Sequence, residues 1–275
     1  MTISASQALN DLDWVVSSPS LADDPLAVPP VPLDRSAVDA DHLADFLASR
    51  QEHRVGRYFE HLLSYWFRHV RQVEMIGEGV HIRDEQNRTL GEMDFLFRDE
   101  DGVLNHCEAT VKFFLHYPND QGSHFPGPAA RDNFERKATR LFDKQLPVSK
   151  IHAPDVEIRS AFTRGRVFEH LRVPGPETLP ERLSPNRLGG AWVRETELEL
   201  LDGFGDVGFS IVPKPLWFSP VLDGPVLTRE EFDEDLGRHF DGPGYPVMVS
   251  LRDADLSEVN RCFVVPEAWP QTSSK

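Results

Sequence analysis

The sequence predicts an α/β protein in which a mixed central sheet is flanked by helices. Apolar residues recur at helical spacing in segments 54–71 and 129–145, and three strand-like runs joined by short polar turns lie between them. A further strand-like run follows at 156–163. The expected order is therefore helix, three-stranded meander, helix, strand.

Each element has its own signal. The first helix carries a broad apolar stripe with Glu60 at its edge. The three strands are expected at 73–82, 89–97 and 103–115, and Asp101-Gly102 marks a hairpin turn before the third. Pro147 ends the second helix, because proline cannot continue the helical hydrogen bonds.

The chain divides into three predicted parts. Residues 1–40 form an irregular N-terminal arm, since segment 17–35 holds five prolines and little periodicity. Residues 41–172 form the α/β core. Residues 173–275 form a C-terminal α+β extension or lobe of short strands with one helix. That helix opens at Thr228, with Glu231 three residues later as a capping box.

Composition limits the function classes. The 275 residues carry a formal charge of −16, which argues against a protein that coats nucleic acid nonspecifically but allows an enzyme with a local basic groove. No apolar run is long enough for a membrane span, and residues 1–9 show no secretory signal. Two cysteines, Cys107 and Cys262, exclude a disulfide framework. We therefore expect a cytoplasmic protein without membrane partners.

The third predicted strand holds the most chemistry. Its side chains alternate between an apolar face and a face that includes Glu108 and Lys112. On the preceding strand, Asp94 lies between Met93 and Phe95, and the hairpin would set it beside residues near Glu108 to Lys112. Two carboxylates and a lysine would suit an oxygen-ligated Mg²⁺ or Mn²⁺. A partly buried ion pair is the alternative interpretation of the same residues.

Several stretches carry a family resemblance, and they span about residues 55–147: Gly56-Arg57-Tyr58-Phe59-Glu60, Arg88 to Phe95, His106 to Phe114, Gly127-Pro128 and Lys137 to Leu146. They resemble the PD-(D/E)XK phosphodiesterase superfamily, whose restriction-endonuclease-like core has the predicted element order. More narrowly, the chain resembles the bacterial family of unknown function DUF1853.

The resemblance implies roles for five residues. Asp94 and Glu108 would be the metal ligands, and Lys112 would be the catalytic lysine. Glu60 would be the acid of the first helix, and Gln145 the polar residue on the helix after the sheet. The implied cofactor is Mg²⁺ or Mn²⁺.

One spacing departs from the superfamily pattern. There the acid and the lysine are usually separated by one residue, whereas Glu108 and Lys112 are separated by three, with Thr110 between them. Their Cα atoms would lie roughly 13 Å apart on an extended strand. A lysine leaning back, or a bulge, would close the gap.

Two functions follow from these observations. The first is a metal-dependent phosphodiesterase that hydrolyses nucleic acid, DNA rather than RNA. The basic residues of the second helix would then flank a phosphate path: Arg131, Arg136, Lys137, Arg140 and Lys144. The alternative is an inactive nuclease-like scaffold that binds a protein or a nucleic acid. A glycine-rich match at 203–208 precedes a strand-like run rather than a helix, which argues against dinucleotide binding.

Overall fold

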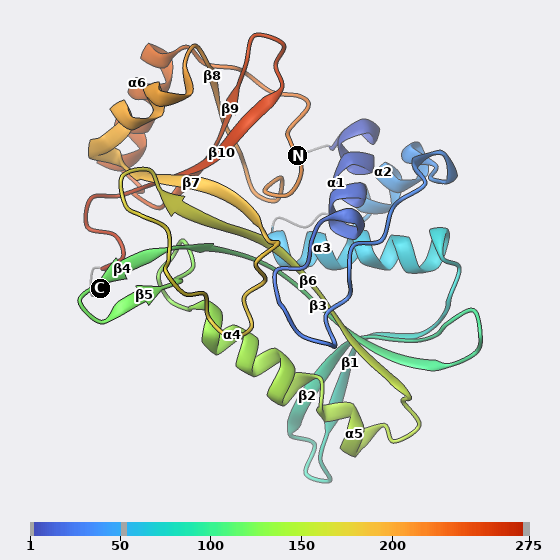
Figure 1. Ribbon diagram of the computed structural model, residues 1–275. Helices are drawn as coiled ribbons and strands as arrows, with labels where there is room; N and C mark the ends of the chain where they lie inside the picture. Colours follow the sequence, from blue (N-terminus) through green and yellow to red (C-terminus); the bar gives the residue numbers. More distant parts are fainter. Residues whose placement is uncertain (1–2, 51–53, 272–275) are drawn as a thin grey trace. The chain divides into compact units, whose positions relative to one another are not determined.

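The computed structural model describes residues 3–50 and 54–271 (Figure 1). Within these residues, eight strands form one sheet in the order β1-β2-β3-β6-β7-β10-β9-β8. Their bounds are β1 Glu74–Arg83, β2 Thr89–Arg98, β3 Leu104–Leu115, β6 Ile158–His170, β7 Leu188–Arg194, β8 Gly208–Ile211, β9 Val247–Arg252 and β10 Glu258–Val265. A separate small hairpin joins β4, Tyr117–Asn119, to β5, Gly122–His124.

The sheet is mixed, as predicted. The pairs β1–β2, β2–β3, β9–β10 and β8–β9 are antiparallel. The pairs β6–β7 and β7–β10 are parallel. The C-terminal residues therefore extend the sheet.

Six α-helices accompany the strands within the described part of the chain: α1 Ala5–Ser17, α2 Ala40–Ala48, α3 Val55–Tyr65, α4 Phe134–Arg140, α5 Val148–His152 and α6 Arg229–Asp241. Helix α3 continues into the π-helical segment η2, Trp66–Val70, and α4 into the π-helical segment η3, Leu141–Gln145. A 3₁₀ turn, η1, covers Arg35–Ala37, and a longer one, η4, covers Glu195–Phe204. The order α3, β1–β3, α4, β6 confirms the predicted sequence of core elements.

The chain forms two compact units. Unit 1 contains residues 1–112, 135–165 and 180–187, and unit 2 contains residues 113–134, 166–179 and 188–275. Strands β3 and β6 contribute residues to both units. In unit 1, α3 and η2 pack aromatic side chains against β2: the ring of Phe67 lies 5.3 Å from that of Phe95 and 4.6 Å from that of Phe97. Met93 on the same strand face is also buried, as the alternation predicted.

The prediction of an irregular arm over residues 1–40 is wrong for Ala5–Ser17, which form α1. Two polar residues, Gln7 and Asp11, lie on the buried face of α1 and obscure its periodicity in the sequence. They satisfy each other: Gln7 donates to Asp11 at 3.2 Å, and the Tyr58 hydroxyl donates to Asp11 at 2.9 Å. A buried polar pair of this kind packs like a core residue once its hydrogen bonds are made.

A buried arginine holds the segment that follows α1. The Arg164 side chain on β6 is fully buried, and its guanidinium donates to the carbonyls of Val15, Val16, Val28 and Pro29. Burial lowers the pKa of Arg164 to about 10. The proline-rich segment is therefore anchored to the sheet although it forms little regular structure.

In unit 2, α6 packs its apolar side on the strands β7 to β10. The rings of Phe209 and Phe232 stack at 4.4 Å within this core. The predicted capping box is present, because Glu231 N–H donates to the Thr228 hydroxyl and Thr228 N–H donates to the Glu231 carboxylate. The glycine-rich match at 203–208 is followed by strand β8, as expected for a turn.

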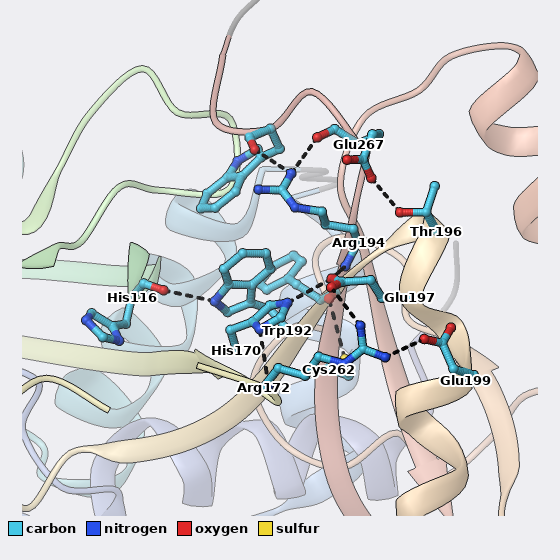
Figure 2. Close-up of polar contacts among 12 residues, drawn as sticks. His116, His170, Arg172, Trp192, Arg194, Thr196, Glu197, Glu199, Cys262 and Glu267 are labelled. Atoms are coloured by element: carbon cyan, nitrogen blue, oxygen red, sulfur yellow. Dashed lines mark hydrogen bonds and ion pairs between the residues drawn. The ribbon is translucent and has the colours of Figure 1, made fainter. Parts of the chain in front are cut away.

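Strand β7 ends at Arg194, and residues 195–204 form the 3₁₀ helix η4 directly after it. Figure 2 shows the reason. The Glu197 carboxylate accepts the backbone N–H of Arg194 at 3.1 Å and thereby starts the helix where β7 ends. The same carboxylate is 2.8 Å from His170 Nε2.

Candidate active site

Adjacent strands place Asp94 and Glu108 side by side. The antiparallel register of β2 and β3 runs from Arg98↔Leu104 to Phe95↔Cys107, so that the next pair in the alternation is Asp94 with Glu108. Beyond the Phe95–Cys107 pair, a side-chain oxygen accepts the next hydrogen bond between the two strands. The Ala109 N–H donates to Asp94 Oδ2 at 2.8 Å. The structure thus confirms that the hairpin brings the two predicted ligands together.

Glu108 is held on both of its oxygens. The side chain is 1% exposed. Its Oε1 lies 2.8 Å from His106 Nε2, and its Oε2 accepts a hydrogen bond from Gln145 Nε2 at 3.1 Å. Gln145 ends η3, so the second helix reaches the strand face as the sequence predicted. Three of the five predicted residues, Asp94, Glu108 and Gln145, therefore share one site.

His106 is a member of the site that the sequence analysis did not assign. Its Nδ1 lies 2.9 Å from the Ser149 hydroxyl on α5, and Arg159 Nε donates to the same hydroxyl at 2.9 Å. Burial lowers the pKa of His106 to about 4, so the ring is neutral near pH 7. A neutral ring can donate to Glu108 from Nε2 while it accepts from Ser149 at Nδ1. The available signal was its position on the same strand face, two residues before Glu108.

Burial and nearby charge raise the pKa values of both carboxyl groups. Burial, followed by the nearby charge of Glu108, raises the pKa of Asp94 to about 8. Burial raises the pKa of Glu108 to about 7, against the lowering effect of a hydrogen bond with the Asp94 side chain. Neighbouring carboxyls that cannot both ionise share either a proton or a cation.

Two further acidic side chains add negative charge around Asp94 and Glu108. Glu60 on α3 and Glu92 on β2 both raise the pKa values of Asp94 and Glu108 through their charges. Glu60 is itself paired with Arg57, at 2.5 Å, one turn earlier on the helix. Glu60 therefore lies near the acidic pair, while its own hydrogen bond goes to Arg57. No role for Glu92 was predicted from the sequence.

Lys112 lies further along the same strand. It is half-buried, four residues beyond Glu108 on the continuous strand β3, a separation of roughly 13 Å between Cα atoms. Strand β6 approaches closely here, because a Cβ on Gly165 would lie 1.8 Å from the Lys112 carbonyl oxygen. Within β3, the contacts described above for the acidic pair involve residues 106–109. A catalytic role for Lys112 stays a prediction.

The donor atoms fit a hard divalent cation in their chemistry. Asp94 and Glu108 offer carboxylate oxygens, which Mg²⁺ and Mn²⁺ prefer. Within residues 3–50 and 54–271, no group of three or more His, Cys, Asp or Glu side chains is arranged to hold a metal. Mg²⁺ commonly uses one or two carboxylates, with water and phosphate oxygens as its other ligands. Asp94 and Glu108 are thus the residues that would hold it.

A second polar cluster, in unit 2, is internally satisfied (Figure 2). Arg172 pairs with Glu197 at 3.6 Å and with Glu199 at 2.7 Å. Burial acts to raise the pKa of Glu197, but hydrogen bonds from His170 and Arg194 leave it below its usual value. These contacts join η4 to β6 and β7, which indicates a structural role.

The fold and the acidic pair define an α/β protein with two interacting carboxyl groups on adjacent strands. The chain belongs to the family described as "Domain of unknown function (DUF1853)", whose model matches residues 3–265. No curated protein and no solved structure matches the chain. In the described part of the chain, every helix is too short or too polar to cross a bilayer. The family is thus confirmed, while the resemblance to PD-(D/E)XK enzymes stays a prediction.

Proposed function

We propose that this protein is a phosphodiesterase that hydrolyses nucleic acid, DNA in preference to RNA, with Mg²⁺ or Mn²⁺ bound by Asp94 and Glu108. The observation that carries the proposal is the pair itself: two carboxyl groups on adjacent strands, where burial raises both pKa values and the charge of Glu108 raises that of Asp94 further. A divalent cation would remove that repulsion and allow both groups to ionise.

The residues around the pair would have distinct tasks. The bound cation would polarise the phosphate and lower the pKa of a bound water. Gln145 and His106 hold the Glu108 carboxylate from two sides and so fix its orientation. Lys112 would place a positive charge on the same strand face, where negative charge develops on the phosphate. Glu60 would act through its charge on the acidic pair.

The charge of the neighbouring helical segment supports a nucleic acid substrate. Residues 134–152 contain five basic residues and two acidic ones, in a chain whose formal charge is −16. The basic residues are Arg136, Lys137, Arg140, Lys144 and Lys150, and the acidic residues are Glu135 and Asp143. Gln145 belongs to this segment and bonds Glu108, so the segment adjoins the acidic pair. A local basic surface beside a metal site is typical of proteins that bind a phosphate backbone.

The test is cleavage of linear, circular and single-stranded DNA and of RNA by the full chain with Mg²⁺ or Mn²⁺. Asp94→Asn keeps the shape of the side chain and removes its charge, and Glu234→Gln on the exposed face of α6 is the matched control. We expect metal-dependent cleavage that falls ~100-fold or more in Asp94→Asn, because loss of outer partners alone costs about 10–100-fold. Equal cleavage by the two variants would reject this site.

A noncatalytic scaffold is the second candidate, and a specific observation favours it. Both oxygens of Glu108 already face N–H donors, from His106 and Gln145, so the carboxylate has internal partners without a cation. In that case the wild type would show no cleavage with either metal. It would still bind DNA or a protein partner, with equal affinity in the wild type and in Asp94→Asn, which fluorescence anisotropy with labelled DNA would measure.

A further inference from the structure

A polar hollow of about 380 Å³ opens in unit 2. Its lining comes from three adjacent strands and one loop: Arg166 on β6, Gly189 and Gly190 on β7, Pro220, and Glu258, Val259, Asn260 and Arg261 on β10. Gly190 leaves β7 without a side chain in this lining. A Cβ at this position would clash, because it would lie 2.5 Å from the Phe168 ring and 2.7 Å from the Arg261 carbonyl oxygen. The volume lies in the range of small-molecule sites.

Of the two arginines in the hollow, Arg261 makes its hydrogen bonds within the protein. Arg261 donates to the carbonyls of Phe218 and Ser219, at 3.0 and 2.7 Å. Its remaining donors meet the Glu258 carboxylate, at 2.6 Å from Nη2 and 3.2 Å from Nε. Arg261 and Glu258 therefore neutralise each other, and Ser250 completes the pair by donating to Glu258 at 2.7 Å.

The other arginine is not satisfied. Arg166 Nη1 donates to the Gly189 carbonyl at 3.0 Å. Its Nε–H is buried and has no hydrogen-bond partner among the residues that the structure describes. Burial lowers the pKa of Arg166 to about 10, and the charge of Arg261 lowers it further than Glu258 raises it. A buried donor without a partner calls for an explanation, and the local field at this donor is positive.

We propose that this hollow binds the oxyanion of a small molecule, a carboxylate or a phosphate group, through the Nε and Nη2 edge of Arg166. That edge is the planar pair of donors that matches two oxygens of such a group. The bound anion would neutralise Arg166, as the Glu258 carboxylate neutralises Arg261. Asn260, in the same lining, carries a further side-chain donor. The inference rests on unit 2 alone and is independent of the proposed activity.

The test uses the full chain and two probes, inorganic phosphate and acetate, in thermal unfolding scans. Sodium chloride of equal ionic strength is the reference. We expect the melting temperature to rise with either probe beyond the chloride reference, with half-saturation at millimolar concentration. In Arg166→Gln, the probe concentration at half-saturation should be at least tenfold higher than in the wild type. Arg238→Gln, an exposed arginine on α6 outside the hollow, should leave it unchanged.

A second variant guards against misfolding. If Arg166→Gln loses its native circular dichroism, Arg166→Lys is used, because it keeps the charge and removes the planar fork. It should bind both probes more weakly than the wild type. A wild type that responds to phosphate and acetate no more than to chloride would overturn the proposal. So would equal responses of the wild type and the Arg166 variant.

Discussion

Replacing Asp94 by asparagine should stabilise the protein above neutral pH. In the folded protein, burial and the charge of Glu108 raise the pKa of Asp94 from 3.8 to about 8. The amide of asparagine carries no charge. Its oxygen can still accept the Ala109 N–H, and its nitrogen can donate to Glu108. The substitution therefore removes a repulsion and keeps the hydrogen bonds.

The sign and size of this stability gain follow from the number of protons that the folded and unfolded chains bind. Because the folded pKa is raised, the folded protein binds more protons than the unfolded chain between about pH 4 and pH 8, so stability falls as the pH rises through this window. The rise in the Asp94 pKa from 3.8 to about 8 corresponds to ~6 kcal/mol at most, since a tenfold change in proton affinity is worth about 1.36 kcal/mol. Asp94 is only half-buried, so solvent screens part of this effect. We therefore expect a gain of about 2 kcal/mol for Asp94→Asn at pH 8.5.

Urea denaturation between about pH 5.5 and pH 8.5 measures this gain. The free energy of unfolding of the wild type should fall across the range, and that of Asp94→Asn should fall less. The exposed control Glu234→Gln should follow the wild type. Parallel curves for the wild type and Asp94→Asn would refute the reasoning, because they would show that the two carboxyl groups do not oppose each other's ionisation.

Three further predictions concern individual contacts. His106→Ala removes one hydrogen-bond partner from each of the buried groups Glu108 Oε1 and Ser149 Oγ, so urea denaturation should show a loss of about 1–3 kcal/mol. Arg164→Met removes the guanidinium hydrogen bonds to four backbone carbonyls of the N-terminal segment, and should cost ~3 kcal/mol or more and expose residues 18–34 to limited proteolysis. Thr228→Ala removes the N-cap of α6 and should lower stability by ~1 kcal/mol, measured by thermal unfolding.

The core could be predicted from the sequence where one pattern governs one element. The stripe of the first helix, the alternation through Met93 and Phe95, and the capping box at Thr228 all survive in the structure. Helix α1 could not be predicted in this way, because Gln7 and Asp11 occupy its buried face and only their contacts in the fold explain them.

The candidate site shows the same limit. Asp94 and Glu108 were predicted as neighbours because a tight hairpin fixes which residues face each other. His106 was not, because its partner Ser149 lies on a helix 43 residues later. Such contacts between distant segments leave no spacing pattern in a single sequence.

The central claim is that Asp94 and Glu108 hold a divalent cation, and Mn²⁺ binding measured by electron paramagnetic resonance tests it most directly. The account predicts one Mn²⁺ bound per chain by the wild type and by the control Glu234→Gln. It predicts that Asp94→Asn and Glu108→Gln lose this binding while they retain native circular dichroism. Unchanged Mn²⁺ binding in both variants, or no binding by the wild type, would contradict the claim.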